Sequence, residues 1–414
     1  MAQQPLDCPG VGWRILALVF VANRPPRPTA PTYLTIAVPS LKVHPTPLQN
    51  ALDLARQALW LTSPNPRVGC VITAADGTLL GQGHTQRAGG PHAEIMALRD
   101  ATQRGHSVQG ATAWVTLEPC AHQGRTGPCC DALAAAGIGR VVSAMTDPNP
   151  QVAGQGLARL AAAGVQTETL APTSGEAIQA RELNIGFFSR MERGLPWVRM
   201  KVATSLDGQT ALQNGQSQWI TGPEARTDGH AWRARACAIL TGIGTVLEDD
   251  PQLNVRGVNT PRQPHLVVVD SRLDMPLTAK LLDTQGTGDQ ARKIWIYTAT
   301  AEHTDKGAAL TARGVTVIDC PGPGGKVDLA AMLRDLARRE INELHVEAGH
   351  KLNGSFIREG LVDEYLVYIA PQLLGPGQGM ANLPALTDLG GAVKLAFQAV
   401  DRIGPDLRLL LRKA

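Results

Sequence analysis

The pattern that most constrains the fold of this chain is an alternation of strand-like apolar runs with helix-like segments. Residues 48–61 have the apolar spacing of a helix, and the run VGCVI at 68–72 follows as a strand. Further helical patterns at 93–101, 131–137 and 157–164 alternate with apolar runs at 113–117 and 140–145. Alternation at these lengths indicates an α/β layer fold with a largely parallel sheet.

The alternation starts again after residue 188, which indicates a second α/β domain. Strands are expected at 197–203, 238–242, 265–270, 293–299, 344–349 and 361–371, and helices at 223–236 and 327–340. No fixed-period repeat interrupts this pattern. A chain of 414 residues suits two or three domains at ~150 residues each. We place the boundary within 190–196 and expect domains at 45–190 and 195–414.

The first 44 residues differ from the rest. The apolar run at 15–22 loosely imitates a secretory segment, but Asp7 precedes it and few basic residues do. A proline-rich tract, PPRPTAP, follows. We interpret 1–44 as a disordered extension or as a start site assigned too far upstream.

Composition excludes several classes of protein. The hydrophobic fraction of 43% is enough for large cores, which excludes a disordered polymer. A net charge of +3 gives no reason to expect nucleic-acid binding. The sequence has no apolar run of ~18 residues, so no membrane span is predicted. The odd count of seven cysteines, three of them within 120–130, favours metal binding in a reducing compartment over a disulfide framework. We therefore expect a cytoplasmic protein.

Four residues at the ends of predicted elements form a candidate zinc site. His92 and Glu94 begin a predicted helix, Cys120 follows a buried strand, and Cys129 opens the next helix. One imidazole and two thiolates leave the fourth zinc position open for water, as in catalytic sites. Zinc lowers the pKa of that water toward ~7. Glu94, two residues beyond His92, can take the water's proton and pass it to a leaving amine.

The cysteine spacing narrows the class of deaminase. H-x-E with P-C-x-x-C is the zinc-deaminase signature, but here eight residues separate Cys120 from Cys129, which argues against cytidine and nucleic-acid deaminases. A structural zinc or unmetallated buried thiols are the alternatives. Cys130 is expected to point away from the metal, and His122 is either a residue of the site mouth or a less favoured ligand.

Longer motifs extend this interpretation to a family. The segments SPNPRVGCVI (63–72), PHAEIMAL (91–98), VTLEPCAHQGRTGPCCDAL (115–133) and TDPNPQVAGQG (146–156) closely resemble the bifunctional riboflavin-biosynthesis deaminase/reductase family. The second half resembles it too, in KVATSLDGQTA (201–211), SQWIT (217–221), TVLEDDPQLNVR (245–256), VEAG (346–349) and YIAPQLLG (368–375). The resemblance runs from about residue 47 to the C-terminus.

This resemblance implies two consecutive reactions on a phosphoribosyl pyrimidine. The first half, cytidine-deaminase-like with three layers, would remove the 2-amino group of 2,5-diamino-6-(5-phosphoribosylamino)pyrimidin-4-one. The second half, dihydrofolate-reductase-like, would use NADPH to reduce the ribosyl group to a ribityl chain. By resemblance His92, Cys120 and Cys129 hold zinc and Glu94 moves the proton. Asn65 and Arg125 match substrate contacts, and either His84 or Thr85 takes the place of a substrate-contacting histidine.

The resemblance also assigns the reductase site. The substrate contacts that it implies are Ser217, Arg233, Leu253, Arg256 and Glu347. The implied NADPH contacts are Ala203, Trp219, Thr245, Asp249, Ser271, Gly349, His350, Lys351, Leu352, Asn353, Gly354 and Ser355.

From the residues alone, the reductase half is less explicit. The segment 346–355 indicates a strand and a glycine-rich turn opening a helix, which suits a cofactor phosphate or a structural turn equally well. It lacks the P-loop lysine, and no G-x-G-x-x-G follows the first strand. Arg233 could lie on a solvated helix face and Trp219 in a core. Lys201 and Asp207 are candidate proton-transfer groups.

Two other functions remain to be weighed against the bifunctional enzyme. One is a nucleoside or tRNA deaminase fused to an unrelated α/β domain, and the other is a non-catalytic zinc-stabilised module. The cysteine spacing and the lack of a basic, aromatic-laced patch disfavour the first, and Glu94 disfavours the second. The expected partner is a small phosphoribosyl pyrimidine, with no nucleic acid and no membrane, and a homo-oligomer is left open.

Overall fold

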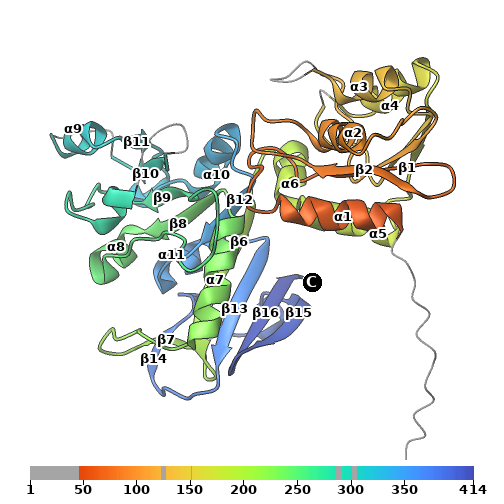
Figure 1. The fold of residues 1–414 in the computed structure, drawn as a ribbon. Coiled ribbons are helices and arrows are strands. Elements are labelled where there is room, and N and C mark those ends of the chain that lie inside the picture. The colour runs from red at the N-terminus through yellow and green to blue at the C-terminus, as the bar shows by residue number, and fades with distance from the viewer. Residues whose placement is uncertain (1–45, 123–126, 151, 285–290, 301–304) are drawn as a thin grey trace, which may run out of the picture. The chain divides into compact units, whose positions relative to one another are not determined.

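The computed structural model describes residues 46–122, 127–150, 152–284, 291–300 and 305–414 (Figure 1). The predicted extension at 1–44 and Arg125 lie outside these residues. The described residues belong to one compact unit, and they form a five-stranded sheet, a nine-stranded sheet and a two-stranded sheet.

The five-stranded sheet belongs to the first half of the chain. Its order is β2-β1-β3-β4-β5, with β1 antiparallel to both β2 and β3 and the β3, β4 and β5 strands parallel. The strands are β1 Gly69–Thr73, β2 Leu79–His84, β3 Thr112–Val115, β4 Arg140–Ser143 and β5 Gln166–Thr169.

Helices cover both faces of this sheet, giving the expected three layers. Cys70 and Ile72 pack in one cluster with α2, α3 and α4, whereas Val71 packs in another with α1 and α5, as the two-residue period of a strand requires. Figure 1 shows α1 beside α5. The helices are α1 Pro47–Gln57, α2 Ala93–Gln103, α3 Cys129–Ala135, α4 Gln155–Ala162, α5 Gly175–Leu183 and α6 Ile185–Arg193.

The nine-stranded sheet belongs to the second half. Its order is β11-β10-β9-β8-β12-β6-β13-β16-β15, parallel from β11 to β13 and antiparallel where β16 and β15 join. The strands are β6 Trp197–Ser205, β8 Ala238–Gly242, β9 His265–Val269, β10 Ile294–Thr298, β11 Val315–Asp319, β12 Glu343–Val346, β13 Glu364–Ala370, β15 Leu395–Ile403 and β16 Asp406–Lys413. Strands β7 Gln209–Leu212 and β14 Gly377–Gly379 form the two-stranded sheet.

Helices follow most of the parallel strands. They are α7 Pro223–Arg235, α8 Ile243–Asp249, α9 Asp305–Ala312, α10 Leu329–Arg338 and α11 His350–Arg358, with 3-10 turns at Lys280–Thr284, Pro323–Gly325 and Leu389–Gly391. The largest core cluster lies between the central strands and α10, whose Leu329, Met332, Leu333 and Leu336 are buried. No helix in the described ranges is long and apolar enough to cross a membrane.

The mixed α/β class predicted from the alternation is confirmed. The nine-stranded sheet is largely parallel as expected, but the five-stranded sheet is mixed, because β1 pairs antiparallel with both β2 and β3. The segment 190–196, where we placed the boundary, is partly helical, because α6 continues to Arg193 and ends at Gly194 with φ +67°. Strands β2, β5, β7, β11, β14, β15 and β16 were not predicted.

Candidate active sites

The three predicted zinc ligands come together at the ends of their elements. Cys129 Sγ lies 3.4 Å and Cys120 Sγ 3.6 Å from His92 Nδ1, and all three ligand atoms lie within 4.8 Å of one another. The Cys129 backbone N–H donates to Cys120 Sγ at 3.4 Å. Hydrogen bonding from Cys129 lowers the pKa of Cys120 to about 4, which favours a thiolate. The residues fit zinc, since two sulfur ligands and one imidazole at these spacings leave one position open.

Glu94 lies beside this group in the first turn of α2. Its side chain is buried. Burial, reinforced by the charge of Cys120, raises the pKa of Glu94 to about 7. A carboxyl group that titrates near neutrality suits general acid–base work.

The two open questions about neighbouring residues are answered by geometry. Cys130 Sγ points to Asp131 Oδ1 at 3.6 Å, away from the ligand cluster, as expected. His122 is not part of the ligand group among the described residues, although it lines the same cavity. His122 therefore belongs to the site mouth.

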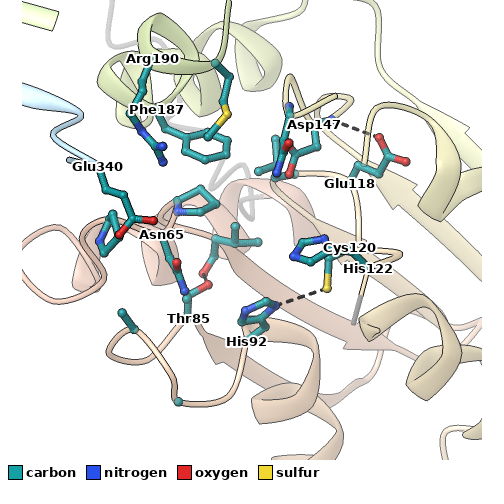
Figure 2. Close-up of a pocket in the computed structure, with 18 of the residues that line it drawn as sticks. Asn65, Thr85, His92, Glu118, Cys120, His122, Asp147, Phe187, Arg190 and Glu340 are labelled. Carbon is teal, nitrogen blue, oxygen red and sulfur yellow. Dashed lines mark hydrogen bonds between the residues drawn. The ribbon is translucent and has the colours of Figure 1, made fainter. Parts of the chain in front are cut away.

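The ligand group opens into a cavity of about 470 Å³ (Figure 2). Asn65 and Thr85 line it, whereas His84 does not, because neighbouring residues of an extended segment point to opposite sides. Thr85 is therefore the candidate for the pyrimidine contact. The cavity's other lining residues are Pro64, Pro66, Val68, Ala88, Gly89, Gly90, His92, Glu94, Leu117, Glu118, Cys120, His122, Asp147, Asn149, Phe187, Arg190, Met191 and Glu340.

Glu118 has a role that the sequence analysis missed. Its buried carboxylate accepts four backbone N–H bonds, from Asp147, Gly154, Gly156 and Leu157, at 2.9–3.2 Å. A Cβ at Gly156 would come 1.9 Å from the Pro119 carbonyl oxygen, so only glycine fits there. Glu118 thus anchors the loop that brings Asp147 and Asn149 to the cavity. No sequence signal distinguishes this glutamate from a catalytic one.

The predicted NADPH contacts gather at one edge of the nine-stranded sheet. Ala203, Thr245, Ser271 and Gly349 lie on, or follow the carboxyl ends of, the adjacent strands β6, β8, β9 and β12. Open α/β sheets bind ligands outside the carboxyl ends of their strands. A Cβ added at Gly349 would lie 3.8 Å from Thr245 Oγ1, so these two positions are neighbours. Asp249 ends α8, which begins at this edge.

The segment 349–355 serves two purposes. Gly349 caps α11, and the first turn of the helix offers backbone N–H groups that suit a phosphate. Asn353 and Gly354 are buried instead: Asn353 donates to the Met380 carbonyl at 3.0 Å, and a Cβ at Gly354 would lie 2.2 Å from Asn382 O. The arrangement fits NADPH at the start of the helix and a packing role at its fourth and fifth residues.

The predicted substrate contacts centre on Glu347, one residue beyond β12. Arg233 donates to both carboxylate oxygens of Glu347, at 2.8 Å from Nη2 and also from Nε. The solvated helix face considered for Arg233 is therefore wrong. Burial would raise the pKa of Glu347, but Arg233 outweighs it and holds that pKa well below its usual range.

The other predicted contacts range from exposed Trp219 and Arg256 to buried Leu253. Trp219 is 69% exposed, which excludes the core role considered for it. The Arg256 backbone N–H donates to His230 Nδ1 at 3.2 Å, and Leu253 adopts a left-handed φ of +46°. Ser217 is half-buried. Half-buried Lys201 lies within the electrostatic reach of Glu347, whereas exposed Asp207 accepts backbone N–H bonds from Leu374 and Gly375.

Comparisons with known proteins agree with both halves. Residues 42–145 match the cytidine and deoxycytidylate deaminase zinc-binding region, and residues 196–409 match the RibD C-terminal domain. The riboflavin biosynthesis protein RibD of Escherichia coli is 43% identical over 88% of this chain and 98% of that protein. The Haemophilus influenzae protein of the same name is 42% identical over 87% of this chain and 95% of its own.

Two solved structures share the fold. Acinetobacter baumannii RibD superposes with a TM-score of 0.79 at 40% identity, covering 89% of this chain and 98% of its own. A diaminohydroxyphosphoribosylaminopyrimidine deaminase/5-amino-6-(5-phosphoribosylamino)uracil reductase from Thermotoga maritima gives 0.76 at 28% identity, with the same coverage.

Fold and site together define a two-part enzyme in which a cytidine-deaminase-like zinc domain precedes an NADPH-dependent reductase domain. The chain belongs to the RibD family of bifunctional deaminase/reductases of riboflavin biosynthesis.

Proposed function

We propose that the chain catalyses two steps on one phosphoribosyl pyrimidine. In the first, water replaces the 2-amino group of 2,5-diamino-6-(5-phosphoribosylamino)pyrimidin-4-one and ammonia leaves. In the second, NADPH reduces the ribosyl group of the product to a ribityl chain. The observation that carries the proposal is the cluster of His92, Cys120 and Cys129 beside buried Glu94 in a cavity of about 470 Å³. The printed name of the Thermotoga relative supports this choice of substrate.

In the deaminase site we assign the proton transfer to Glu94 and zinc binding to His92, Cys120 and Cys129. Zinc, when bound, would make hydroxide available at neutral pH by lowering the pKa of the water in its open position. Glu94 takes the proton from the attacking water and returns it to the departing amine, so that the carboxyl group ends as it began. Asn65 and Arg125 are assigned to the substrate, with Arg125 outside the described residues.

In the reductase site we assign the NADPH contacts to the carboxyl edge of β6, β8, β9 and β12. NADPH supplies the hydride for the reduction. Glu347 accepts from ribosyl hydroxyls, and Ser217, Leu253 and the arginines Arg233 and Arg256 hold the rest of the substrate. Lys201 is the better candidate for the proton donor, because Asp207 is bound to two backbone N–H groups of a turn. The nicotinamide and phosphate contacts are assigned to Ala203, Trp219, Thr245, Asp249, Ser271 and residues 349–355.

We further propose that each activity has its own domain, at 45–190 and 195–414. The separate sheets of the two halves support this division. The six described cysteines are free thiols, which supports a cytoplasmic setting, and neither nucleic acid nor membrane is part of the proposal. A homo-oligomer is compatible with it.

One assay tests the proposal. Purified protein is given the diaminopyrimidinone phosphoribosyl substrate with and without NADPH, and ammonia and NADPH absorbance are followed. We expect ammonia in both cases and NADPH oxidation after it. Ammonia without NADPH oxidation would remove the reductase half of the proposal. If zinc-loaded protein gives neither ammonia nor NADPH oxidation, the non-catalytic zinc-stabilised module is favoured. If it deaminates cytidine or tRNA instead, the nucleoside or tRNA deaminase fused to an unrelated domain is favoured.

A further inference from the structure

Two charged side chains line the deaminase cavity on the side away from the metal ligands. Arg190 of α6 and Glu340, which follows α10, both line it (Figure 2). Glu340 belongs to the second half of the chain, so the reductase half contributes a wall to the deaminase cavity. Figure 2 shows Arg190, Phe187 and Glu340 across the cavity from Cys120 and His92.

Arg190 is held in place through its Nε atom, and its two Nη atoms make no hydrogen bond within the described residues. Its Nε donates to Asn342 Oδ1 at 2.6 Å, and its guanidinium carbon lies 5.9 Å from the centre of the Phe187 ring. Asn342 also donates from Nδ2 to the Pro64 carbonyl at 2.8 Å, directly before Asn65. Within the described ranges, neither Nη atom of Arg190 has a hydrogen bond or ion pair. The arginine is therefore positioned for a ligand in the cavity.

The backbone at Glu340 does not favour a glutamate. Its φ of +65° lies in the left-handed region that glycine or asparagine adopts more readily after a helix. Its N–H completes the helix end by donating to the Ala337 carbonyl at 3.0 Å, a bond that any such residue would make. The side chain is exposed and lines the cavity, and the helix end does not require a glutamate there.

Arg190 and Glu340 act on each other electrostatically without being joined. Burial lowers the pKa of Arg190, and the charge of Glu340 opposes that shift. No ion pair links the two among the described residues, so a polar group can fit between them. The Arg190 guanidinium can donate hydrogen bonds into the cavity, and the Glu340 carboxylate can accept them. This pair suits hydroxyl groups, which both donate and accept. A phosphate would be repelled by the carboxylate.

We propose that Arg190 and Glu340 form the subsite for the ribosyl hydroxyls of the deaminase substrate. This inference rests on the proposed function. The cavity is larger than a pyrimidine ring needs and falls in the size range of small-molecule sites. With ring carbon 2 at the metal ligands, the ribosylamino group on carbon 6 extends away from them. Part of the deaminase specificity then comes from the reductase half.

Substitutions at Glu340 test the subsite by ammonia release without NADPH. Glu340→Gln and Glu340→Gly should raise the KM on the order of tenfold, with kcat nearly unchanged, because the lost contact is remote from the reacting carbon. Arg190→Gln should raise the same KM. Arg338→Gln, on the same helix end and paired with Asp335 at 3.2 Å, is the matched control and should leave the KM unchanged.

Two further readouts separate a binding role from a structural one. Glu340→Gly should keep or raise the thermal midpoint, since glycine suits the left-handed backbone, and all Glu340 variants should reduce 5-amino-6-(5-phosphoribosylamino)uracil at the wild-type rate. An unchanged KM in both Glu340 variants would overturn the subsite. A lowered KM in Glu340→Gln would overturn it too, since the carboxylate would then face the phosphate. If the wild type releases no ammonia, it is the proposed function that fails.

Discussion

Arg67 and Glu343 form a buried ion pair, 2.6 Å between Nη1 and Oε1, although 276 positions of the chain separate them. Arg67 lies two residues after Asn65 of the deaminase cavity, and Glu343 begins β12, which leads to Glu347 of the reductase site. Arg199 and Arg235 donate to the other oxygen of Glu343, at 3.0 and 2.7 Å. One carboxylate therefore connects elements of both candidate sites.

Removing this carboxylate should destabilise the protein strongly. Burial would raise the pKa of Glu343, but the charges of Arg235, Arg67 and Arg199 outweigh it and hold that pKa well below its usual range. Glu343→Gln leaves the guanidinium groups of Arg67 and Arg235 without their counter-charge and Arg199 with Glu364 alone, and we expect a loss of about 3–5 kcal/mol in the free energy of unfolding. Urea unfolding measures it. Arg104→Gln, which breaks an exposed pair with Asp100, should cost under ~1 kcal/mol, and an equal loss would contradict the role of burial.

Neighbouring cysteines should differ in their effect on zinc. Cys129→Ser removes a ligand and should lower the zinc content and ammonia release together. Cys130→Ser should keep both, because the Cys130 thiol points to Asp131. Metal analysis of the purified variants measures the difference. Zinc retained in Cys129→Ser but lost in Cys130→Ser would reverse the assignment.

Glu94→Gln should separate metal binding from proton transfer. The amide keeps the size of the side chain but cannot take a proton from water, so ammonia release should fall by roughly 10²–10⁴-fold. The zinc content should stay at the wild-type level, because Glu94 is not in the ligand group. Loss of zinc from this variant would make Glu94 a ligand instead. NADPH oxidation on the deaminated substrate serves as the internal control.

The sequence predicted those features that depend on local pattern. The apolar run predicted as a strand at 68–72 corresponds to β1. The ligands His92, Cys120 and Cys129 lie close together because each stands at the end of a helix or strand of the same domain. Strand β5, QTET, has four exposed polar residues and pairs with β4, so an analysis based on apolar runs could not reveal it.

Contacts between segments far apart in the chain could not be predicted from the sequence. Nothing local shows that Asn342 bonds to Pro64, or that Glu340 reaches the cavity of Cys120. The same holds for Glu118, which looks like part of a metal motif but binds the backbone of a loop about thirty residues further on. These features need the packed structure, because they are set by how elements far apart in the chain meet.

Acid should weaken the fold through His265. Burial, with the charges of Arg262, Lys293 and Arg292, lowers the pKa of His265 to about 4, and its Nδ1 accepts from the Lys293 N–H at 3.0 Å. The unfolded chain binds the proton below pH ~6.5, whereas the folded chain does not until about pH 4. Stability should therefore fall between these values as pH decreases, by at most ~3 kcal/mol from this residue.

Comparing variants isolates the His265 contribution from acid release of zinc, which all of them share. His265→Gln keeps an acceptor but cannot take the proton in this range, so its urea midpoint should fall less than that of the wild type between pH 7 and pH 4.5. His106→Gln, at an exposed position, should follow the wild type. Equal falls in all three proteins would show that His265 is not a source of the acid sensitivity.

Arg233 should affect the reductase step alone. Its pairing with Glu347 fixes a carboxylate at the end of β12, and Nη1 also donates to the Asn254 carbonyl at 3.0 Å. Arg233→Met leaves Glu347 without this partner and removes a fork for the substrate, so kcat/KM for NADPH oxidation should fall on the order of 100-fold. Ammonia release should stay within twofold of the wild type, since Arg233 is not among the residues that line the deaminase cavity. A parallel loss of both activities would mean that the substitution damages the fold, and an unchanged NADPH rate would remove Arg233 and Glu347 from the reductase site.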